Sequence, residues 1–593
     1  MAILPDPWLD ILIAAAVVAV MAGRILFTDR PLPVDLTNAI WLGSAMSHSV
    51  LSGLPPTFFI NTKSADLAGV FNPVFAFYGG PLLALFGLLT DALGHSVLAA
   101  LDVLVTLAFA SAYGGTAWIS RQCGLRGRLP HVPAVAVISA PYFVTDLYGR
   151  GDLPEFVALS SIPLLVASTV HLVRAKSWTP GPTVLFILSV IVFTGSHNIS
   201  LVWGTLIGLT VLVVLAAIPR SGNPSIARLC AVAGLGMLAV MVNGWYLLPD
   251  VVFGDTTAVA QVAMNVGSTT ASSFFDTPAL LFNPFRSVPS QSGTAALYVQ
   301  APVWFLGWST LCGIWIWFKS SLVELRKWWT ALGMLLAALF ILIIETSLWN
   351  LIPTALQVIQ FPYRLNGYVL LLTAALVLVS LLAVQRQLTG ANRSLVGRGL
   401  LAILVGVMSI SMGTAIWQEW VPQSCNWVGV SCAPNRSSNL TPPHVLPLTW
   451  YGGNNYTDTT APVVEVPADR SFSFSPDLID TRGDSLAGTF DPPGGTQPFL
   501  TNITAGPELV TIGGGIERVG RSEAGMAVVR RVQPGDGPVR VVIETADNPA
   551  TQAGPWLSLT GLIGVVLLVA GQVFLRWHRR RLAPRRAADG GRP

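Results

Sequence analysis

Three groups of polar residues stand beside long apolar stretches of the chain, and they hold residue types that can move protons or bind phosphate. The first group contains Asp35, His48 and the aromatic residue Tyr78. A carboxylate in a loop next to an apolar helix can act as a general base on a sugar hydroxyl. Asp35 could equally cap a helix that begins at Leu36, and residue chemistry alone favours that interpretation slightly.

The second group lies in the short sequence YGRGDLPEF, where Arg150, Asp152 and Glu155 share one tight turn between apolar segments. The planar guanidinium of arginine suits a phosphate group, which accepts two parallel hydrogen bonds. The alternative is a turn that neutralises itself, with Arg150 paired to Asp152. The two interpretations carry equal weight at this point.

The third group is spread over two later loops, with His197 in TGSHNIS and Arg364 in QFPYRLNGY. A single histidine at a helix end is more often structural than catalytic. Arg364 could extend its charged end to lipid head groups or contact a lipid-linked phosphate. We therefore treat His197 as a supporting residue and Arg364 as a candidate phosphate ligand.

Motifs of nucleotide and metal enzymes are missing from the sequence. It has no P-loop, no G-x-G-x-x-G after a strand, no H-E-x-x-H and no G-x-S-x-G. No set of His, Cys and acidic residues has the spacing of a metal site. No cofactor is firmly expected, although Asp152 and Glu155 could hold a divalent cation or position an acceptor.

The composition indicates what kind of scaffold positions these groups. The chain has 593 residues, of which 52% are hydrophobic and 11% are charged, and its mean hydropathy is +0.62. Soluble domains carry about 25% charged residues. These values exclude a soluble enzyme, a disordered chain and a disulfide-dense secreted scaffold. They predict an α-helical polytopic membrane protein embedded in a lipid bilayer.

Twelve apolar segments are long enough to be predicted as transmembrane helices: 8–27, 96–119, 131–147, 155–173, 182–196, 200–217, 226–248, 299–318, 329–348, 365–384, 399–417 and 556–575. Basic residues occupy every second connection, which predicts that these connections are cytoplasmic. A thirteenth apolar segment, 73–93, contains Pro73, a Gly-Gly-Pro break and Asp91, so we place it as a helix on the outer membrane face. Both termini are then cytoplasmic, in the plasma (inner) membrane.

The sequence also predicts the domain boundaries. Residues 1–417 form the transmembrane domain, with a large first outer loop at 28–95. Residues 418–555 form a β-rich extracytoplasmic insert, in which 526–532 and 539–544 alternate as strands do. A last transmembrane helix, 556–576, leads into a basic tail at 577–593, which is too short and too poor in aromatic residues to indicate nucleic-acid binding. Cys425 and Cys432 in the insert favour a disulfide over free thiols.

Short motifs in a fixed order carry a resemblance to a known family. The order is VDL, GLPP and NPVFAFY in the first outer loop, then YGRGDLPE, TGSHN and QFPYR. This pattern resembles the bacterial "6-pyruvoyl-tetrahydropterin synthase-related" membrane protein family, within the GT-C superfamily of glycosyltransferases, whose relatives include arabinofuranosyltransferases. The resemblance covers about residues 1–385 and does not include the β-rich insert.

The resemblance implies a GT-C-like fold, a polyprenyl-phosphate sugar donor and a cell-envelope glycan or glycolipid acceptor. It implies that Asp35 is the catalytic base of an inverting glycosyltransferase and that Arg150 and Arg364 contact the donor phosphate. GT-C enzymes often have paired acids in the first loop, whereas Val34 precedes Asp35 here, which leaves Asp29 as a second candidate. The alternative functions are a transporter or flippase, or a non-catalytic assembly protein, for lipid-linked saccharides.

Overall fold

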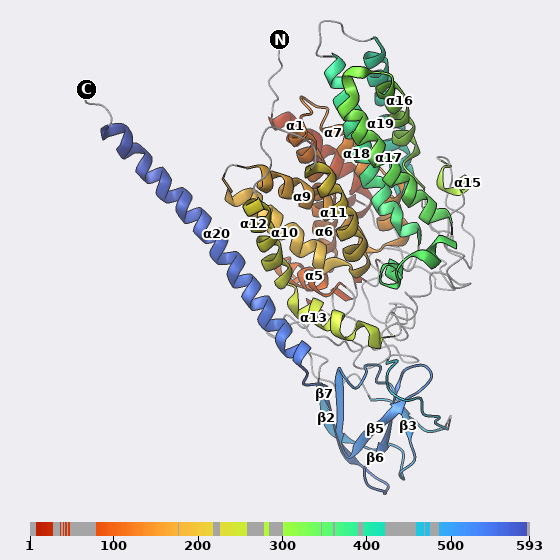
Figure 1. Cartoon of the computed structure of the whole chain (residues 1–593). Coiled ribbons are helices and arrows are strands. Elements are labelled where there is room, and N and C mark those ends of the chain that lie inside the picture. Colours follow the sequence, from red (N-terminus) through yellow and green to blue (C-terminus); the bar gives the residue numbers. More distant parts are fainter. Residues whose placement is uncertain are drawn as a thin grey trace.

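The computed structural model describes most of the helical part and much of the β-rich part of the chain (Figure 1). The described residues are 7–27, single residues between 36 and 47, 79–216 without 176, 226–257, 278–283, 300–420 without 346, 360–361 and 389–394, 458–474 without 468, and 485–589. Asp29, Asp35, His48, Tyr78, Cys425 and Cys432 lie outside them, so the predictions made for these residues stay predictions.

Helices dominate the described residues up to Trp420, and their bounds follow the predicted apolar segments closely. They are α1 (Pro7–Met21), α2 (Gly23–Phe27), α5 (Gly80–Ala92), α6 (Val97–Gln122), α7 (His131–Ile138), α8 (Pro141–Thr145), the π-helical turn η1 (Asp146–Arg150), α9 (Leu153–Arg174), α10 (Pro180–Ser196), α11 (Asn198–Ala216), α12 (Ile226–Met241), α13 (Gly244–Phe253), α15 (Pro278–Leu281), α16 (Val303–Trp317), α17 (Val323–Ile344), the 3-10 turn η7 (Pro362–Leu365), α18 (Asn366–Leu388) and α19 (Leu395–Trp420).

Six helical segments are long and apolar enough to cross a membrane, and the number rises to eight if two bent helix pairs each count as one span. The bent pairs are α7 with α8–η1, at 48°, and α12 with α13, at 81°. The protein is thus a multi-pass membrane protein, and the predicted number of twelve crossings is not reached by this criterion. The other four predicted crossings correspond to α1, α10, α11 and α16. Each of these apolar helices has only 10–17 residues in the described part of the chain that meet the criterion, which is fewer than the long spans have.

Helices α9 and α18 form the centre of the bundle. Within the 18-residue apolar stretch of each helix, 83% of the residues of α18 and 67% of those of α9 are buried, compared with 22% in α17 and in α19. Helix α6 approaches α9 closely at Gly115, where a Cβ atom would lie 2.3 Å from the backbone nitrogen of Leu164. Only glycine permits this approach, so Gly115 fixes how α6 supports the central helix.

The β-rich part contains two small sheets. Both segments predicted as strands, 526–532 and 539–544, form strands in them. One has the order β1 (Ser471–Phe472), β3 (Phe499–Thr501), β6 (Ala527–Arg531) and β5 (Ile516–Arg521), and the other has the order β2 (Ser485–Phe490), β7 (Val539–Thr545) and β4 (Val510–Gly514). Their shared core also includes Leu42, Met46 and Leu83. The β-rich part therefore packs against α5 and against the described residues of the first loop.

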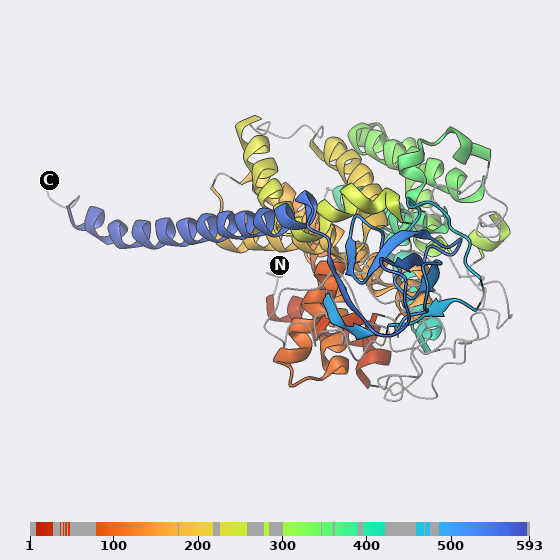
Figure 2. The same cartoon turned by 90° about the horizontal axis from the view of Figure 1, so that it is seen from below.

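Helix α20 (Pro549–Asp589) leaves the β-rich part and runs away from the bundle towards the end where α1 begins (Figures 1 and 2). Only 6% of the residues in its 18-residue apolar stretch are buried inside the protein. Near its start it crosses α12 at Gly561, where a Cβ atom would lie 2.7 Å from the backbone nitrogen of Val242. The described ends of α1 and α20 share one end of the molecule, in agreement with the prediction that both termini lie on one side.

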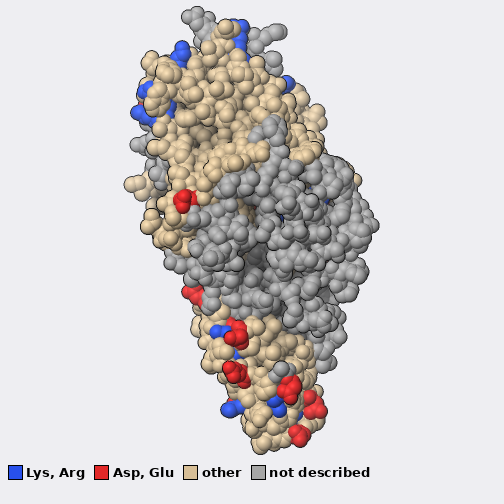
Figure 3. Space-filling view, turned by 90° about the vertical axis from the view of Figure 1, so that its right-hand side faces the viewer, with Lys and Arg blue, Asp and Glu red and all other residues tan. Residues whose placement is uncertain are grey.

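Charge is distributed unequally along the molecule. Figure 3 shows lysine and arginine at the bundle end opposite the β-rich part, and most of the acidic side chains over the β-rich part. Lysine and arginine also lie among the acidic side chains of the β-rich part (Figure 3). The side of the membrane that each end faces stays a prediction.

Candidate functional site

The sequence YGRGDLPEF builds a turn that leads charged side chains into the bundle. The π-helical turn η1 ends at Gly151, whose φ of 84° is accessible to glycine at little cost. Asp152 then caps α9, because its carboxylate accepts a hydrogen bond of 3.1 Å from the backbone N–H of Glu155. The capping and the glycine explain why Arg150, Asp152 and Glu155 converge.

Arg150 lies at the centre of a buried ionic cluster. Its guanidinium is 2.6 Å from Asp152 Oδ2 and 2.6 Å from Glu155 Oε2, and 3.5 Å from Asp146 Oδ1. The self-neutralising turn that the sequence left open is thus present. It is larger than expected, because Glu155 and Asp146 also contact Arg150.

Arg364 joins this cluster from η7, more than 200 residues further along the chain. Its Nε lies 3.3 Å from Glu155 Oε2 and its Nη2 lies 3.7 Å from Asp152 Oδ2. The hydroxyl of Tyr142 donates a 2.5 Å hydrogen bond to Glu155 Oε1. Three carboxylates and two guanidinium groups therefore share one buried site with a formal charge of −1.

All members of the ionic cluster are withdrawn from solvent. Arg150 is 7% exposed, Arg364 is 5% exposed, and Asp146, Asp152 and Glu155 are 1–2% exposed. Charges in such surroundings interact more strongly than at a surface, and removing one partner leaves the other without compensation. In this state Arg364 contacts acids inside the protein, so the alternative in which it extends to lipid head groups is not what the structure describes.

His197 lies beside the cluster at the junction of α10 and α11. Its Nδ1 is 2.9 Å from Ser200 Oγ and accepts a 3.3 Å hydrogen bond from the backbone N–H of Ser200. Burial lowers the pKa of His197 to about 4, although the negative charges of Asp152 and Glu155 oppose this shift. His197 is therefore neutral near pH 7, with its proton on Nε2.

Asp152 is ionised under the same conditions. Burial by itself would raise the pKa of its carboxyl group, but the positive charges of Arg150 and Arg364 and the backbone hydrogen bond from Glu155 lower it well below its usual range. Asp152 is consequently an ion-pair partner and a hydrogen-bond acceptor. It does not donate a proton at neutral pH.

Asp152, Glu155 and His197 are also the group that comes closest to a metal site in the described part of the chain, with ligand atoms within 4.8 Å of one another. The donors do not fit an ion in this arrangement. Both carboxylates already contact two guanidinium groups, and the protonated Nε2 of His197 offers no lone pair. No step of the chemistry proposed below uses a metal ion.

A second polar group adjoins His197, and its members Tyr246 and Asp250 were missed by the sequence reasoning. Asn198 Nδ2 donates a 2.9 Å hydrogen bond to Asp250 on α13. The hydroxyl of Tyr246 donates to the side-chain oxygen of Asn198 and accepts a 3.2 Å hydrogen bond from the backbone N–H of Gly79. These contacts connect the TGSHN motif to the Gly-Gly-Pro turn that begins α5. In the sequence, Asp250 is an isolated acid at the end of the apolar segment NGWYLLPD, so nothing there indicated its polar partner.

Asp146 and Tyr142 are further members that the sequence reasoning missed. Asp146 precedes Arg150 by four residues, and this spacing was a usable signal for an ion pair in a helix. Tyr142 lies in an apolar stretch and had no such signal. The predicted residues Arg150, Asp152, Glu155, His197 and Arg364 do come together, whereas Asp35, His48 and Tyr78 lie outside the described residues.

Comparisons with known proteins give distant structural neighbours only. No protein-family model and no curated protein matches the chain. Among solved structures, the arabinofuranosyltransferase AftD from Mycobacteria is similar with a TM-score of 0.40 and 13% identity, over 71% of this chain and 27% of that one. An oligosaccharyltransferase from Archaeoglobus fulgidus, in the apo form, has a TM-score of 0.35 and 11% identity, over 69% of this chain and 56% of that one. The chain thus spans a quarter to just over half of the length of these neighbours.

Proposed function

We propose that this protein is a GT-C-type membrane glycosyltransferase that moves a sugar from a polyprenyl-phosphate donor to a cell-envelope glycan or glycolipid at the outer membrane face. The observation that supports this proposal most is the ionic cluster. Two of the motifs on which the resemblance rests, YGRGDLPE and QFPYR, supply charged side chains of the cluster, and a third, TGSHN, supplies His197 beside it. They come from four separate elements, and they meet at the bundle end opposite the basic loops.

The proposed chemistry is an inverting displacement. An acceptor hydroxyl attacks the anomeric carbon of the donor sugar, the bond from that carbon to the phosphate oxygen breaks, and the lipid phosphate leaves with the electron pair. Asp35 takes the proton from the hydroxyl, with Asp29 as the second candidate. His48 and Tyr78 in the same loop would support the acceptor or the base.

Arg150 and Arg364 would stabilise the charge that develops on the leaving phosphate. Both guanidinium groups contact carboxylates in the described state. A donor phosphate must therefore compete with Asp152 and Glu155 for the same N–H groups. This exchange would couple donor binding to a rearrangement of η1 and η7, and it gives the two acids a positioning role.

The alternative function is transport of a lipid-linked saccharide, or assembly without catalysis. A polar substrate that crosses the bundle needs polar groups along its route. The charged side chains of the cluster are instead gathered at one end of α9 and α18, and other charged side chains, Arg174 and Arg386, lie at the opposite end. The middle of each helix is apolar apart from hydroxyl groups, most of which bond to the backbone. This distribution favours the enzyme.

The test is a transfer assay with the full-length protein in lipid, polyprenyl-phosphate sugars as donors and envelope glycans as acceptors. We expect transfer by the wild type and its loss in Asp35→Asn, because asparagine keeps the size of the side chain but cannot accept the proton. His95→Asn, a change in an exposed loop residue of the same face, serves as the control. Transfer that persists in Asp35→Asn would remove the base role from this residue, and donor binding without transfer in the wild type would favour the alternative function.

A further inference from the structure

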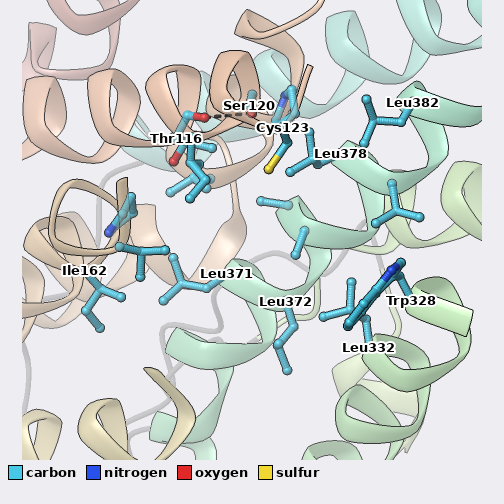
Figure 4. Close-up of a pocket in the computed structure, with 18 of the residues that line it drawn as sticks. Thr116, Ser120, Cys123, Ile162, Trp328, Leu332, Leu371, Leu372, Leu378 and Leu382 are labelled. Atoms are coloured by element: carbon cyan, nitrogen blue, oxygen red, sulfur yellow. Dashed lines mark hydrogen bonds between the residues drawn. The ribbon is translucent and has the colours of Figure 1, made fainter. Parts of the chain in front are cut away.

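A long apolar cavity lies between α6, α9, α11, α17 and α18, apart from the ionic cluster. Its volume is about 550 Å³, which is within the range of about 300–1,000 Å³ typical of small-molecule pockets. Figure 4 shows Leu371, Leu372, Leu378 and Leu382 of α18 along its wall. An apolar molecule that fits against such a wall gains many dispersion contacts.

The dimensions of the cavity select the shape of such an occupant. Its lining on α18 extends from Tyr368 to Arg386, which is about 27 Å at the rise of about 1.5 Å per helical residue. The hydrocarbon layer of a bilayer is about 30 Å thick. The cavity is therefore long enough to take up an extended hydrocarbon chain of a membrane lipid.

The wall offers almost no polar group to an occupant. The hydroxyls of Thr116 and Ser120 each donate a 2.7 Å hydrogen bond to a carbonyl of their own helix. The hydroxyl of Tyr368, at the end near the ionic cluster, donates a 3.2 Å hydrogen bond to the carbonyl of Ser200. The interior therefore suits a hydrocarbon chain and is unsuited to a sugar.

The opposite end of the cavity is charged. Arg174 at the end of α9 and Arg386 near the end of α18 line it, together with Glu324 at the start of α17. Glu324 forms a 3.1 Å ion pair with Lys327, and the lining carries two arginines against this one acid. Basic pockets between transmembrane helices at the cytoplasmic side commonly bind anionic lipid head groups.

We propose that this cavity binds one chain of an anionic phospholipid, with the lipid phosphate at Arg174 and Arg386 and the chain end near Tyr368. The lipid enters from the leaflet next to the basic loops. It is thus distinct from a glycosyl donor, whose phosphate would lie at the ionic cluster, at the other end of the same helices. The proposal does not depend on catalytic activity.

The test measures lipid binding to the full-length protein by native mass spectrometry, with phosphatidylglycerol and phosphatidylcholine of identical chains. We expect at least tenfold preference for phosphatidylglycerol and its loss in the double variant Arg174→Ala with Arg386→Ala. Lys319→Ala with Arg326→Ala removes the same charge at the same end, outside the cavity wall, and should keep the preference.

Two further variants separate the cavity from the membrane surface. Gly208 lines the cavity and a Cβ atom there would meet no atom within 4 Å, so Gly208→Leu should fill part of the cavity and weaken binding of both lipids. Gly114→Leu, which also meets no atom within 4 Å and lies outside the wall, should not.

A photoreactive group at the chain end of phosphatidylglycerol fixes the orientation. It should label peptides around Tyr368 and Leu371. The proposal would be overturned if a head-group probe labelled these peptides instead, or if the two lipids bound with equal affinity. It would also be overturned if both double variants lost the preference for phosphatidylglycerol equally.

Discussion

Replacement of Glu155 by glutamine tests whether the ionic cluster holds the outer end of the bundle together. Glu155 contacts Arg150 at 2.6 Å and Arg364 at 3.3 Å, and it accepts the hydrogen bond from Tyr142. Without this charge, Arg364 loses its nearer carboxylate contact, while its contact with Asp152 at 3.7 Å remains. Breaking a buried ion pair by removing one partner costs about 3–5 kcal/mol, and we expect a destabilisation of this order.

Asp146→Asn is the matched control, because it makes the same change from a carboxyl group to an amide in the same cluster. Its carboxylate oxygens accept no hydrogen bond from the described residues, and its contact with Arg150 is 3.5 Å long. Loss of this weak contact is offset by the smaller cost of burying a neutral amide. We therefore expect a change of less than about 1 kcal/mol.

The assay is thermal unfolding of the purified full-length variants in one detergent, followed by tryptophan fluorescence. The double variant Glu155→Gln with Arg364→Gln should recover part of the lost stability, because it removes both charges of one pair. Equal effects of Glu155→Gln and Asp146→Asn, or no recovery in the double variant, would refute the assigned pairing.

Three other expectations concern separate parts of the molecule. Burial lowers the pKa of His197 in the folded protein to about 4, against an ordinary value of about 6.5. The contribution of neutral His197 to the free energy of unfolding is therefore complete above pH 6.5 and falls by up to about 3 kcal/mol as the pH drops through 4. Unfolding scans from pH 8 to pH 4 should show a shallower loss of stability in His197→Asn. Gly115→Ala should destabilise the bundle because its Cβ would lie 2.3 Å from the α9 backbone, whereas Gly114→Ala meets no atom within 4 Å and should be neutral in the same unfolding measurement. Cys425 and Cys432 should form a disulfide, which intact-mass measurement would detect as a gain of about two mass units on reduction; a reactive thiol at either position without reductant would contradict it.

The sequence predicted the helical elements well because membrane helices must satisfy their backbone hydrogen bonds internally and present apolar side chains to lipid. Those requirements are local, so the twelve apolar segments coincide with helices, and the alternation in 526–532 and 539–544 yielded β6 and β7. The number of crossings was harder to predict. A break such as the one between α12 and α13, with its bend of 81°, depends on how Asn243 is held by Ile191 and Thr194 of α10.

The residue types of the site were likewise visible in the sequence, because charged groups beside apolar helices are costly and therefore conspicuous. Their partners were not visible. Arg364 meets Glu155 only because the fold brings η7, which precedes α18, to the start of α9. Tyr142, Tyr246 and Asp250 acquire polar partners through contacts between elements distant in sequence. Composition and periodicity thus determined a helical membrane protein with polar groups at one end, whereas tertiary packing decided which of those charges neutralise one another, because long-range contacts leave no trace in local sequence.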